Sequence, residues 1–306
     1  GITGGEGTGK SNYVAAIVAG CICPAGADID TLGIQITANG RHKAVLLYDT
    51  EQSEVQLFKN VSNLLARAKQ PDKPDELKAF CLTGMSRKER LNAIVQSMDK
   101  FYYQYGGIQL VVIDGIADLV KSANDEAESV AVIDELYRLA GIYNTCILCV
   151  LHFVPNGLKL RGHLGSELQR KAATILSIEK DEEPTQSVVK ALKVRDGSPL
   201  DVPLMLFAWD KEAGMHVYKG EKPREEKEKR KERELVNVAR DIFGRQTRIT
   251  YIDLCEQLQQ VLDIKERTAK SYIRFMRERD IITKDTANQS CFVIGSYNLQ
   301  RNASCP

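Results

Sequence analysis

Long apolar runs are missing from this 306-residue chain. No run approaches the ~18–20 residues that a helix needs to cross a bilayer, so we expect no membrane-spanning segment. An excess of charge of either sign is also missing, since the net charge is +1 at pH 7. Overall charge therefore gives no sign of a nucleic-acid partner, and any such site must come from a local cluster of cations.

The eight cysteines are too few, in a chain of this length, to form a disulfide scaffold. Cys146 and Cys149 fall inside an apolar run and are expected to be small core residues. Cys21 and Cys23 have no neighbouring histidine or cysteine that would complete a zinc site. This pattern favours reduced thiols in a cytoplasmic protein.

The first eleven residues, GITGGEGTGKS, contain a phosphate-binding pattern, G-x-x-x-x-G-K-[ST], that begins at Gly4. Its glycines allow a tight turn in which successive N–H groups point at phosphate oxygens. Lys10 would reach the β- and γ-phosphates, and the Ser11 hydroxyl would bind Mg²⁺. The alternative is a chance glycine-rich turn. We expect ATP and Mg²⁺ as cofactors, with the nucleotide held by Gly4, Gly5, Glu6, Gly7, Thr8, Gly9, Lys10, Ser11 and Asn12.

Residues 13–18 are apolar and predict a helix whose N-terminus lies under the phosphates. A phosphate loop normally follows a buried strand. Nothing that could form this strand precedes the loop here. We therefore expect the sequence to be a fragment that lacks the first strand of its sheet.

Strand-like and helix-like segments alternate over the first two-thirds of the chain. This pattern predicts an α/β fold with a mostly parallel sheet and flanking helices. The last two strands follow one another without a long helix, which indicates an antiparallel extension at one edge. The expected strands are 44–48, 108–113, 145–151, 173–178 and 188–194, and the expected helices are 55–68, 87–105 and 127–143.

A second domain is expected after residue 220. Residues 221–234 are almost wholly charged and predict a solvated linker or an exposed helix. Beyond them, helices at 235–243, 250–262 and 266–279 precede a small hairpin, which is the order of a winged helix-turn-helix. The expected organisation is a core over 1–220, the charged segment over 221–234 and a winged helix-turn-helix over 235–306.

Three polar residues are expected at the carboxyl edge of the sheet. Asp114 ends a buried strand and fits the role of a Mg²⁺-holding carboxylate beside Ser11. The next residue is glycine, so the base that activates water must lie elsewhere. Glu51 is the best candidate, with Asp49 as its rival and a plain turn role for both as the alternative. His152 ends the strand 145–151 and is either a γ-phosphate sensor or a histidine on a surface loop.

Two groups of cations are candidates for contacts with DNA or with a neighbouring subunit. The glycine-rich segment 153–166 carries Lys159, Arg161 and His163, either as a basic DNA-binding loop or as a solvated one. Lys193 and Arg195 are spaced by two on a predicted strand and share a face. They would act as an arginine finger in a neighbour's site, or serve only to protect an exposed edge.

The third helix of the tail also carries a cluster of cations, which includes Lys270 and Arg274. Such a cluster favours binding in the major groove of duplex DNA. Winged helices also serve as protein-docking modules, and the acidic residues among these cations dilute the cluster.

Taken together, residues 1–220 resemble the RecA/DnaB-type core, most closely the RepA-like hexameric helicase ATPases of bacterial plasmids and mobile elements. The resemblance implies that Lys10 and Ser11 bind phosphate and metal, that Asp114 is the Walker B carboxylate, and that Glu51 is the catalytic base. It also implies that His152 senses phosphate and that Lys193 and Arg195 act in trans. A homo-oligomer, normally a hexameric ring, would hold single-stranded DNA in its central channel.

The expected function is therefore that of an ATP-hydrolysing motor on DNA, a replicative helicase-like protein of a mobile element. A regulator switched by ATP, or a recombination mediator that does not unwind DNA, remains the alternative.

Overall fold

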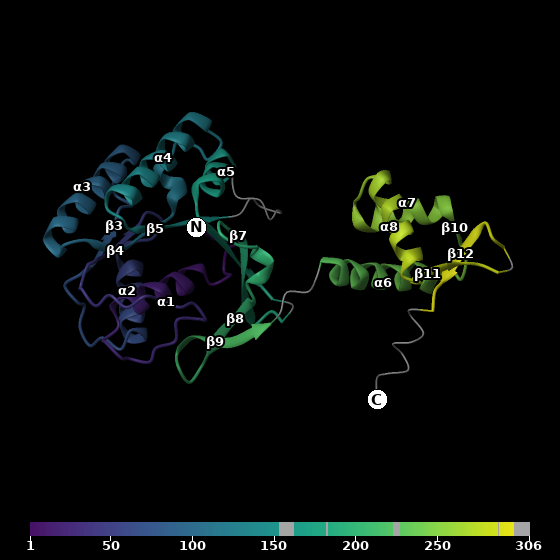
Figure 1. The fold of residues 1–306 in the computed structure, drawn as a ribbon, viewed down its shortest axis with the longest axis horizontal. Coiled ribbons are helices and arrows are strands. Elements are labelled where there is room, and N and C mark those ends of the chain that lie inside the picture. Colours follow the sequence, from purple (N-terminus) through teal and green to yellow (C-terminus); the bar gives the residue numbers. More distant parts are fainter. Residues whose placement is uncertain (153–161, 182, 223–226, 287, 297–306) are drawn as a thin grey trace. The chain divides into compact units, whose positions relative to one another are not determined.

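The computed structural model describes residues 1–152, 162–181, 183–222, 227–286 and 288–296. The chain divides into two units, Gly1–Arg224 and Glu225–Pro306, which are described separately (Figure 1). No helix among these residues is long and apolar enough to cross a membrane.

The first unit is built on a nine-stranded sheet with the order β3-β2-β4-β5-β1-β6-β7-β8-β9. Neighbours from β3 to β6 run parallel, whereas β6 to β9 are antiparallel. The predicted α/β class and its antiparallel extension are confirmed. The strands are β1 (Ile2–Gly4), β2 (Ala44–Asp49), β3 (Leu77–Cys81), β4 (Ile108–Asp114), β5 (Cys146–His152), β6 (Thr174–Lys180), β7 (Gln186–Val194), β8 (Leu204–Asp210) and β9 (Met215–Lys222).

Helices cover both faces of this sheet (Figure 1). One core lies under α3, α4 and α5 and includes Ile94, Leu139 and Leu164. The other lies under α1 and α2 and includes Tyr13 and Leu64. Because both faces are covered, the central strands β2, β4 and β5 are mostly apolar. The helices are α1 (Lys10–Ile22), α2 (Glu54–Arg67), α3 (Arg87–Tyr105), α4 (Glu126–Ile142) and α5 (Gly162–Lys171), with short 3₁₀ turns η1 (Ile116–Leu119) and η2 (Pro199–Asp201).

The expectation that the strand before the phosphate loop is absent is wrong. Residues Ile2–Gly4 form β1, which pairs in parallel with β5 on one side and with β6 on the other. Both neighbours supply hydrogen-bond partners, and all three residues are buried. The loop is therefore anchored at the centre of the sheet.

The described residues of the second unit form three helices and a three-stranded sheet with the order β10-β12-β11. Thr250 caps the second helix, as predicted, by accepting a hydrogen bond from the Asp253 amide. Leu235, Leu258 and Ile273, one from each helix, are almost completely buried in a common core. The elements are α6 (Lys227–Arg245), β10 (Ile249–Thr250), α7 (Tyr251–Leu262), α8 (Glu266–Glu278), β11 (Ile282–Lys284) and β12 (Cys291–Ile294).

The charged segment is not separate from the helix that follows. Helix α6 begins at Lys227, so most of residues 221–234 form its first turns. Mixed charges suit this arrangement, because opposite charges three or four residues apart support an exposed helix. Strands β3, β8 and β9 and helix α5 were not predicted from the sequence.

A buried arginine joins three segments that lie far apart in the sequence. Arg67, at the end of α2, is 6% exposed and donates to the carbonyl oxygens of Asp30 (2.8 Å) and His216 (2.5 Å). The Asp30 carboxylate in turn accepts from the amide of Tyr218 in β9. The loop before β2 is thus tied to the far edge of the sheet.

We expect Arg67→Ala to lower the free energy of unfolding of the first unit by about 3 kcal/mol, because two buried carbonyls lose their donor. Urea denaturation measures this change. Arg170→Ala, at an exposed arginine paired with Glu167, is the control and should cost less than about 0.5 kcal/mol. Equal losses for the two variants would contradict the role given to Arg67.

Candidate active site

The phosphate loop turns sharply between β1 and α1. Gly7 and Gly9 have φ of 67° and 95°, a backbone region that glycine enters without strain. A Cβ on Gly9 would lie 2.8 Å from the Phe207 ring, and one on Gly4 would collide with the Ile178 carbonyl oxygen. Gly7 therefore requires glycine for its conformation, Gly4 for space, and Gly9 for both.

Lys10 is only 8% exposed and lies inside the curve of the loop. Its Nζ donates to the carbonyl oxygens of Gly4 (3.1 Å) and Gly5 (2.6 Å). Burial lowers the pKa of Lys10, while Asp114 and Glu51 oppose this shift. Ser11 and Asn12, by contrast, are exposed at the start of α1.

Strand pairing brings the predicted polar residues to one edge of the sheet. Gly4 pairs with His152 across β1 and β5, and Asp49 pairs with Asp114 across β2 and β4. Strand β5 lies between β1 and β4, so Asp114 is separated from the loop by one strand. Glu51 follows β2 at the same edge. The carboxyl ends of parallel strands thus collect the candidate residues as expected.

Asp49 has a structural role in this arrangement. Its carboxylate, 2% exposed, accepts hydrogen bonds from the amides of Glu51 (3.0 Å) and Gln52 (2.9 Å). The Thr50 hydroxyl donates to the carbonyl oxygens of Asp114 (3.0 Å) and Gly115 (2.8 Å). Both contacts fix the backbone at Glu51. They favour Glu51 over Asp49 as the residue free to act on a ligand.

The surroundings of residue 115 explain why a glycine follows Asp114. Its φ is 95°, and a Cβ there would collide with the Thr50 hydroxyl and lie 2.6 Å from Glu51 Cγ. Only glycine leaves room for the Glu51 side chain beside the end of β4. The role of this glycine was not predicted from the sequence, since it depends on a contact with Thr50 and Glu51 after β2.

Glu51 and His152 meet across the site. The distance from His152 Nε2 to Glu51 Oε2 is 3.4 Å, and both side chains are about one-third exposed. A carboxylate and an imidazole at this distance can share a proton and can both reach a ligand on the loop. His152 therefore lies at the site and not on a remote surface loop.

Asp114 is the most perturbed acid of the site. Burial raises its pKa to about 7, and the neighbouring carboxylates of Asp49 and Glu51 add to the shift, while Lys10 opposes it. No group of three His, Cys, Asp or Glu side chains that could hold a metal occurs among the described residues. Mg²⁺ commonly takes one or two carboxylates together with substrate phosphates and water. Asp114 and the Ser11 hydroxyl fit that limited set of protein ligands.

Lys193 and Arg195 lie at the opposite edge of the sheet. Val189 of β7 pairs with Ile178 of β6, which in turn pairs with Gly4. From Val189, five further residues of β7 carry the chain about 16 Å away from the loop. Lys193 Nζ donates to the carbonyls of Gln169 (2.6 Å) and Arg170 (3.1 Å).

Arg195 donates to the Lys171 carbonyl at 3.0 Å, so both cations cap the C-terminus of α5. The expectation of an edge strand is wrong, because β7 lies between β6 and β8.

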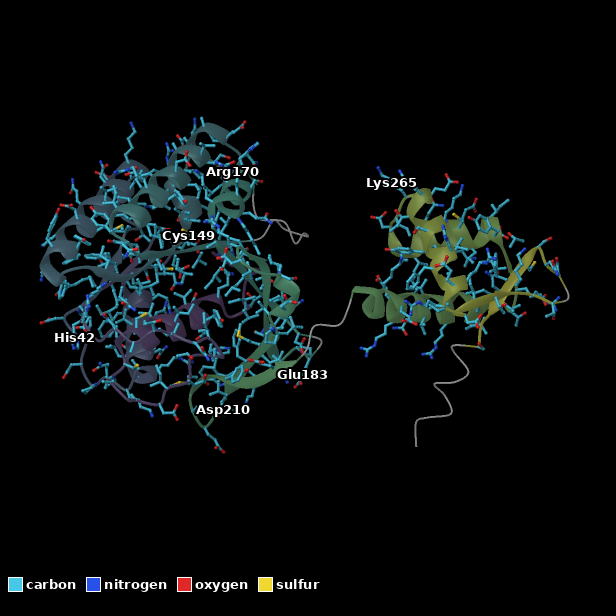
Figure 2. The ribbon with its side chains drawn as sticks, in the orientation of Figure 1. His42, Cys149, Arg170, Glu183, Asp210 and Lys265 are labelled. Carbon is cyan, nitrogen blue, oxygen red and sulfur yellow. The ribbon has the colours of Figure 1, made fainter. Side chains whose placement is uncertain are left out.

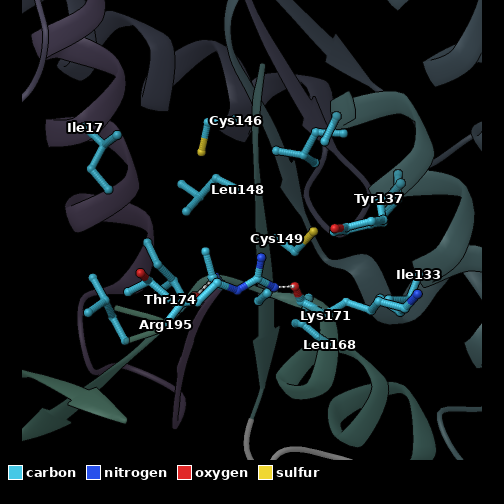
Figure 3. Close-up of a pocket in the computed structure, with 18 of the residues that line it drawn as sticks. Ile17, Ile133, Tyr137, Cys146, Leu148, Cys149, Leu168, Lys171, Thr174 and Arg195 are labelled. Carbon is cyan, nitrogen blue, oxygen red and sulfur yellow. Dashed lines mark hydrogen bonds between the residues drawn. The ribbon is translucent and has the colours of Figure 1, made fainter. Parts of the chain in front are cut away.

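Arg195 also borders a cavity of about 470 Å³ (Figure 3). Apolar side chains such as Leu148 and Leu168 line most of it, with Cys146 and Cys149 on β5. It lies at the amino edge of the sheet, beside Gly1, and so is separate from the phosphate loop.

The predicted basic loop is only partly described. Lys159 and Arg161 lie outside the described residues. The part of segment 153–166 from Gly162 onward is not a loop, because α5 begins there, and His163 is exposed on its first turn.

In the second unit, Lys270 and Arg274 are exposed on α8 but pair with Glu266 (2.7 Å) and Glu278 (2.8 Å). These acids reduce the local positive charge.

Comparison with known proteins adds to this geometry. The model of a family described as an AAA domain matches residues 2–156, a range that contains the loop, Glu51, Asp114 and His152. Among solved structures, the chain is similar to a KaiC-like protein of the hyperthermophilic archaeon Pyrococcus horikoshii OT3. Identity is 12% and the TM-score is 0.48, over 72% of this chain and 88% of that one. No curated protein matches the chain.

The raised pKa of Asp114 makes the stability of the metal-free protein depend on pH. The carboxyl contributes stability fully below its ordinary value of 3.8, and this contribution is lost as pH rises through about 7. We expect Asp114→Asn to stabilise the metal-free protein by about 2–4 kcal/mol at pH 8 and by much less at pH 5. Urea denaturation at both pH values, with exposed Asp72→Asn as control, measures this; a gain independent of pH would contradict it.

Gly115→Ala tests whether the glycine makes room for Glu51. We expect Mg²⁺-dependent ATP hydrolysis to fall about a hundredfold, because the new Cβ displaces Glu51, with nucleotide affinity changed less than about threefold. Gly141→Ala, in helix α4 with open space around it, is the control and should hydrolyse ATP normally. Full activity of Gly115→Ala would show that the position of Glu51 does not matter.

Proposed function

The chain belongs to the AAA domain family, and we propose that it is a ring-forming, RecA-like P-loop ATPase that hydrolyses ATP to move along DNA. In this proposal it resembles the replicative helicases of mobile elements, with ATP bound at junctions between subunits. The family match and the RecA-like core support ATP as the nucleotide. The action on DNA rests on the resemblance and on the distribution of cations.

One observation carries the proposal. Lys10, Asp114, Glu51 and His152 come from four different segments and converge at the loop end of the sheet. Lys10 would bind the β- and γ-phosphates, and backbone amides of the loop would bind their oxygens. Mg²⁺, held by Ser11 and Asp114, would neutralise charge on the phosphates when bound.

Glu51 would accept a proton from the attacking water and orient it toward the γ-phosphate. Its backbone is held by Asp49 and Thr50, so the carboxylate needs little reorganisation to act. His152, 3.4 Å from Glu51, would contact the γ-phosphate and report its presence to the segment after β5.

Lys193 and Arg195 would complete the site of a neighbouring copy. They lie at the edge of the sheet remote from the loop, so they cannot reach the nucleotide bound by their own chain. A head-to-tail assembly joins opposite edges of successive copies and closes into a ring if the rotation permits. Release from the α5 carbonyls would be needed for them to act.

The second unit would act as a winged helix-turn-helix. On α8, Ala269, Ile273 and Met276 are buried, which leaves Lys270 and Arg274 on the exposed side. This face favours a second candidate function, an ATP-switched regulator that binds a duplex site. The acidic residues on α8 weaken this hypothesis, so the regulator is the second candidate.

Two variants test the ATPase. Lys10→Ala should abolish nucleotide binding, because the phosphates lose their buried cation. Glu51→Gln should bind ATP normally but lose turnover about a hundredfold or more, because the amide cannot accept the proton. Phosphate release and equilibrium binding measure both effects, and Glu54→Gln, at an exposed acid of α2, is the matched control. Intact turnover in Glu51→Gln would remove Glu51 from its role.

Displacement of a labelled strand, measured together with ATPase stimulation, separates the two functions. A motor should be stimulated by single strands of any sequence and should displace the labelled strand. A regulator should respond only to its own duplex, or not at all.

A further inference from the structure

A row of aromatic rings runs from the phosphate loop to the surface of the extended sheet. Phe207 of β8 stacks on Tyr13 of α1, with centroids 6.0 Å apart. The edge of Phe207 also packs against Gly9 so closely that no Cβ would fit. His216 of β9 meets Phe207 at 5.7 Å and Trp209 at 5.5 Å, edge to face in both cases.

The strand register places the outer end of this row at the same edge of the sheet as the loop. Gly4 is level with Ile178, Lys180 is paired with Ser187, and Ser187 is paired with Phe207. Trp209, two residues beyond Phe207, shares its face and lies toward the loop end of β8. His216 is its direct partner on β9.

Exposure changes abruptly along the row. Phe207 is completely buried, whereas Trp209 is 55% exposed. Asp210, labelled in Figure 2, accepts hydrogen bonds from the amides of Glu212 and Ala213 (3.1 Å each) and so orders the turn that follows Trp209. The largest aromatic ring of the chain thus packs edge to face against the half-buried ring of His216 and remains more than half exposed.

The charges around the row suit a neutral, flat ligand attached to an anion. Burial lowers the pKa of His216, and the nearby cations Lys180 and Arg67 act in the same direction, so the imidazole is neutral at pH 7. Lys180 is exposed on the same face of the sheet. Phosphates would lie on the loop at one end of the row and an aromatic ring at the other.

We propose that Trp209 is the platform on which the base of the bound nucleoside triphosphate stacks, with His216 holding the indole in place. This rests on the proposed function, because the loop must bind the phosphates for the base to reach Trp209. Stacking on an aromatic side chain strengthens binding of any base, since every base has a π-face. The platform strengthens binding of nucleoside triphosphates relative to inorganic triphosphate, and it discriminates little among the bases.

The chain contains a single tryptophan, so its fluorescence reports on this site alone. ATP should quench Trp209 as it saturates, and inorganic triphosphate should bind with much less change. By calorimetry, Trp209→Ala should weaken ATP about tenfold or more and leave inorganic triphosphate within about twofold. Trp209→Phe should retain most of the ATP affinity. Tyr103→Ala, at an exposed ring on α3, is the control and should change the affinity for neither ligand.

Equal loss of ATP and inorganic triphosphate in Trp209→Ala would overturn the platform, as would unchanged ATP affinity. After either result, the proposed phosphate site would still stand if Lys10→Ala abolishes nucleotide binding. If neither ligand binds the unaltered protein, the proposed function fails together with the platform. A circular dichroism spectrum that matches the unaltered protein shows that each variant is folded.

Discussion

The site depends on one partly buried ammonium group among several carboxylates. Lys10 is held inside the phosphate loop, with Asp114 and Glu51 close enough to influence its pKa. Burial, and after it the nearby carboxylates of Asp49 and Glu51, raise the pKa of Asp114 to about 7. An anionic ligand bound together with a cation would stabilise both charged groups. The phosphates would pair with Lys10, and the cation would pair with Asp114. The stability of the empty protein is thus lowered where the ligand would be bound.

Backbone packing, more than side-chain chemistry, decides which acid is free to act. Asp49 accepts hydrogen bonds from two amides, and Asp114 lies half-buried at the end of β4. Glu51 is the most exposed of the three, and it fits only because residue 115 has no Cβ. The same principle operates at Gly9, where the absence of a side chain lets Phe207 reach the loop. The missing Cβ of Gly115 thus makes room for Glu51, and that of Gly9 brings the loop into contact with the aromatic row.

Much of the core could be predicted from the sequence, because its signals are local. The loop pattern, the apolar strands ending in Asp114 and His152, and the cap at Thr250 are each visible within a few residues. The role of Gly115 could not be predicted, since it depends on a contact with Thr50 and Glu51, which lie far earlier in the sequence. Strands β8 and β9 were missed for a related reason. Strand β8 pairs with β7 and β9 pairs with β8, and nothing within them identifies the partner of Trp209.

The positions of Lys193 and Arg195 show a further limit of sequence reasoning. Their spacing predicted a shared face on an edge strand, but β7 is an inner strand and both cations cap α5. Which edge of the sheet they occupy depends on the direction of β7, and that follows from the antiparallel turn after β6.

A crystal structure with Mg²⁺ and a non-hydrolysable ATP analogue tests the central claim most directly. Lys10 Nζ should leave the Gly4 and Gly5 carbonyls for phosphate oxygens, with the metal between Ser11 and Asp114 and the γ-phosphate facing Glu51. A nucleotide bound elsewhere, or on the loop with Glu51 turned away, would contradict the account.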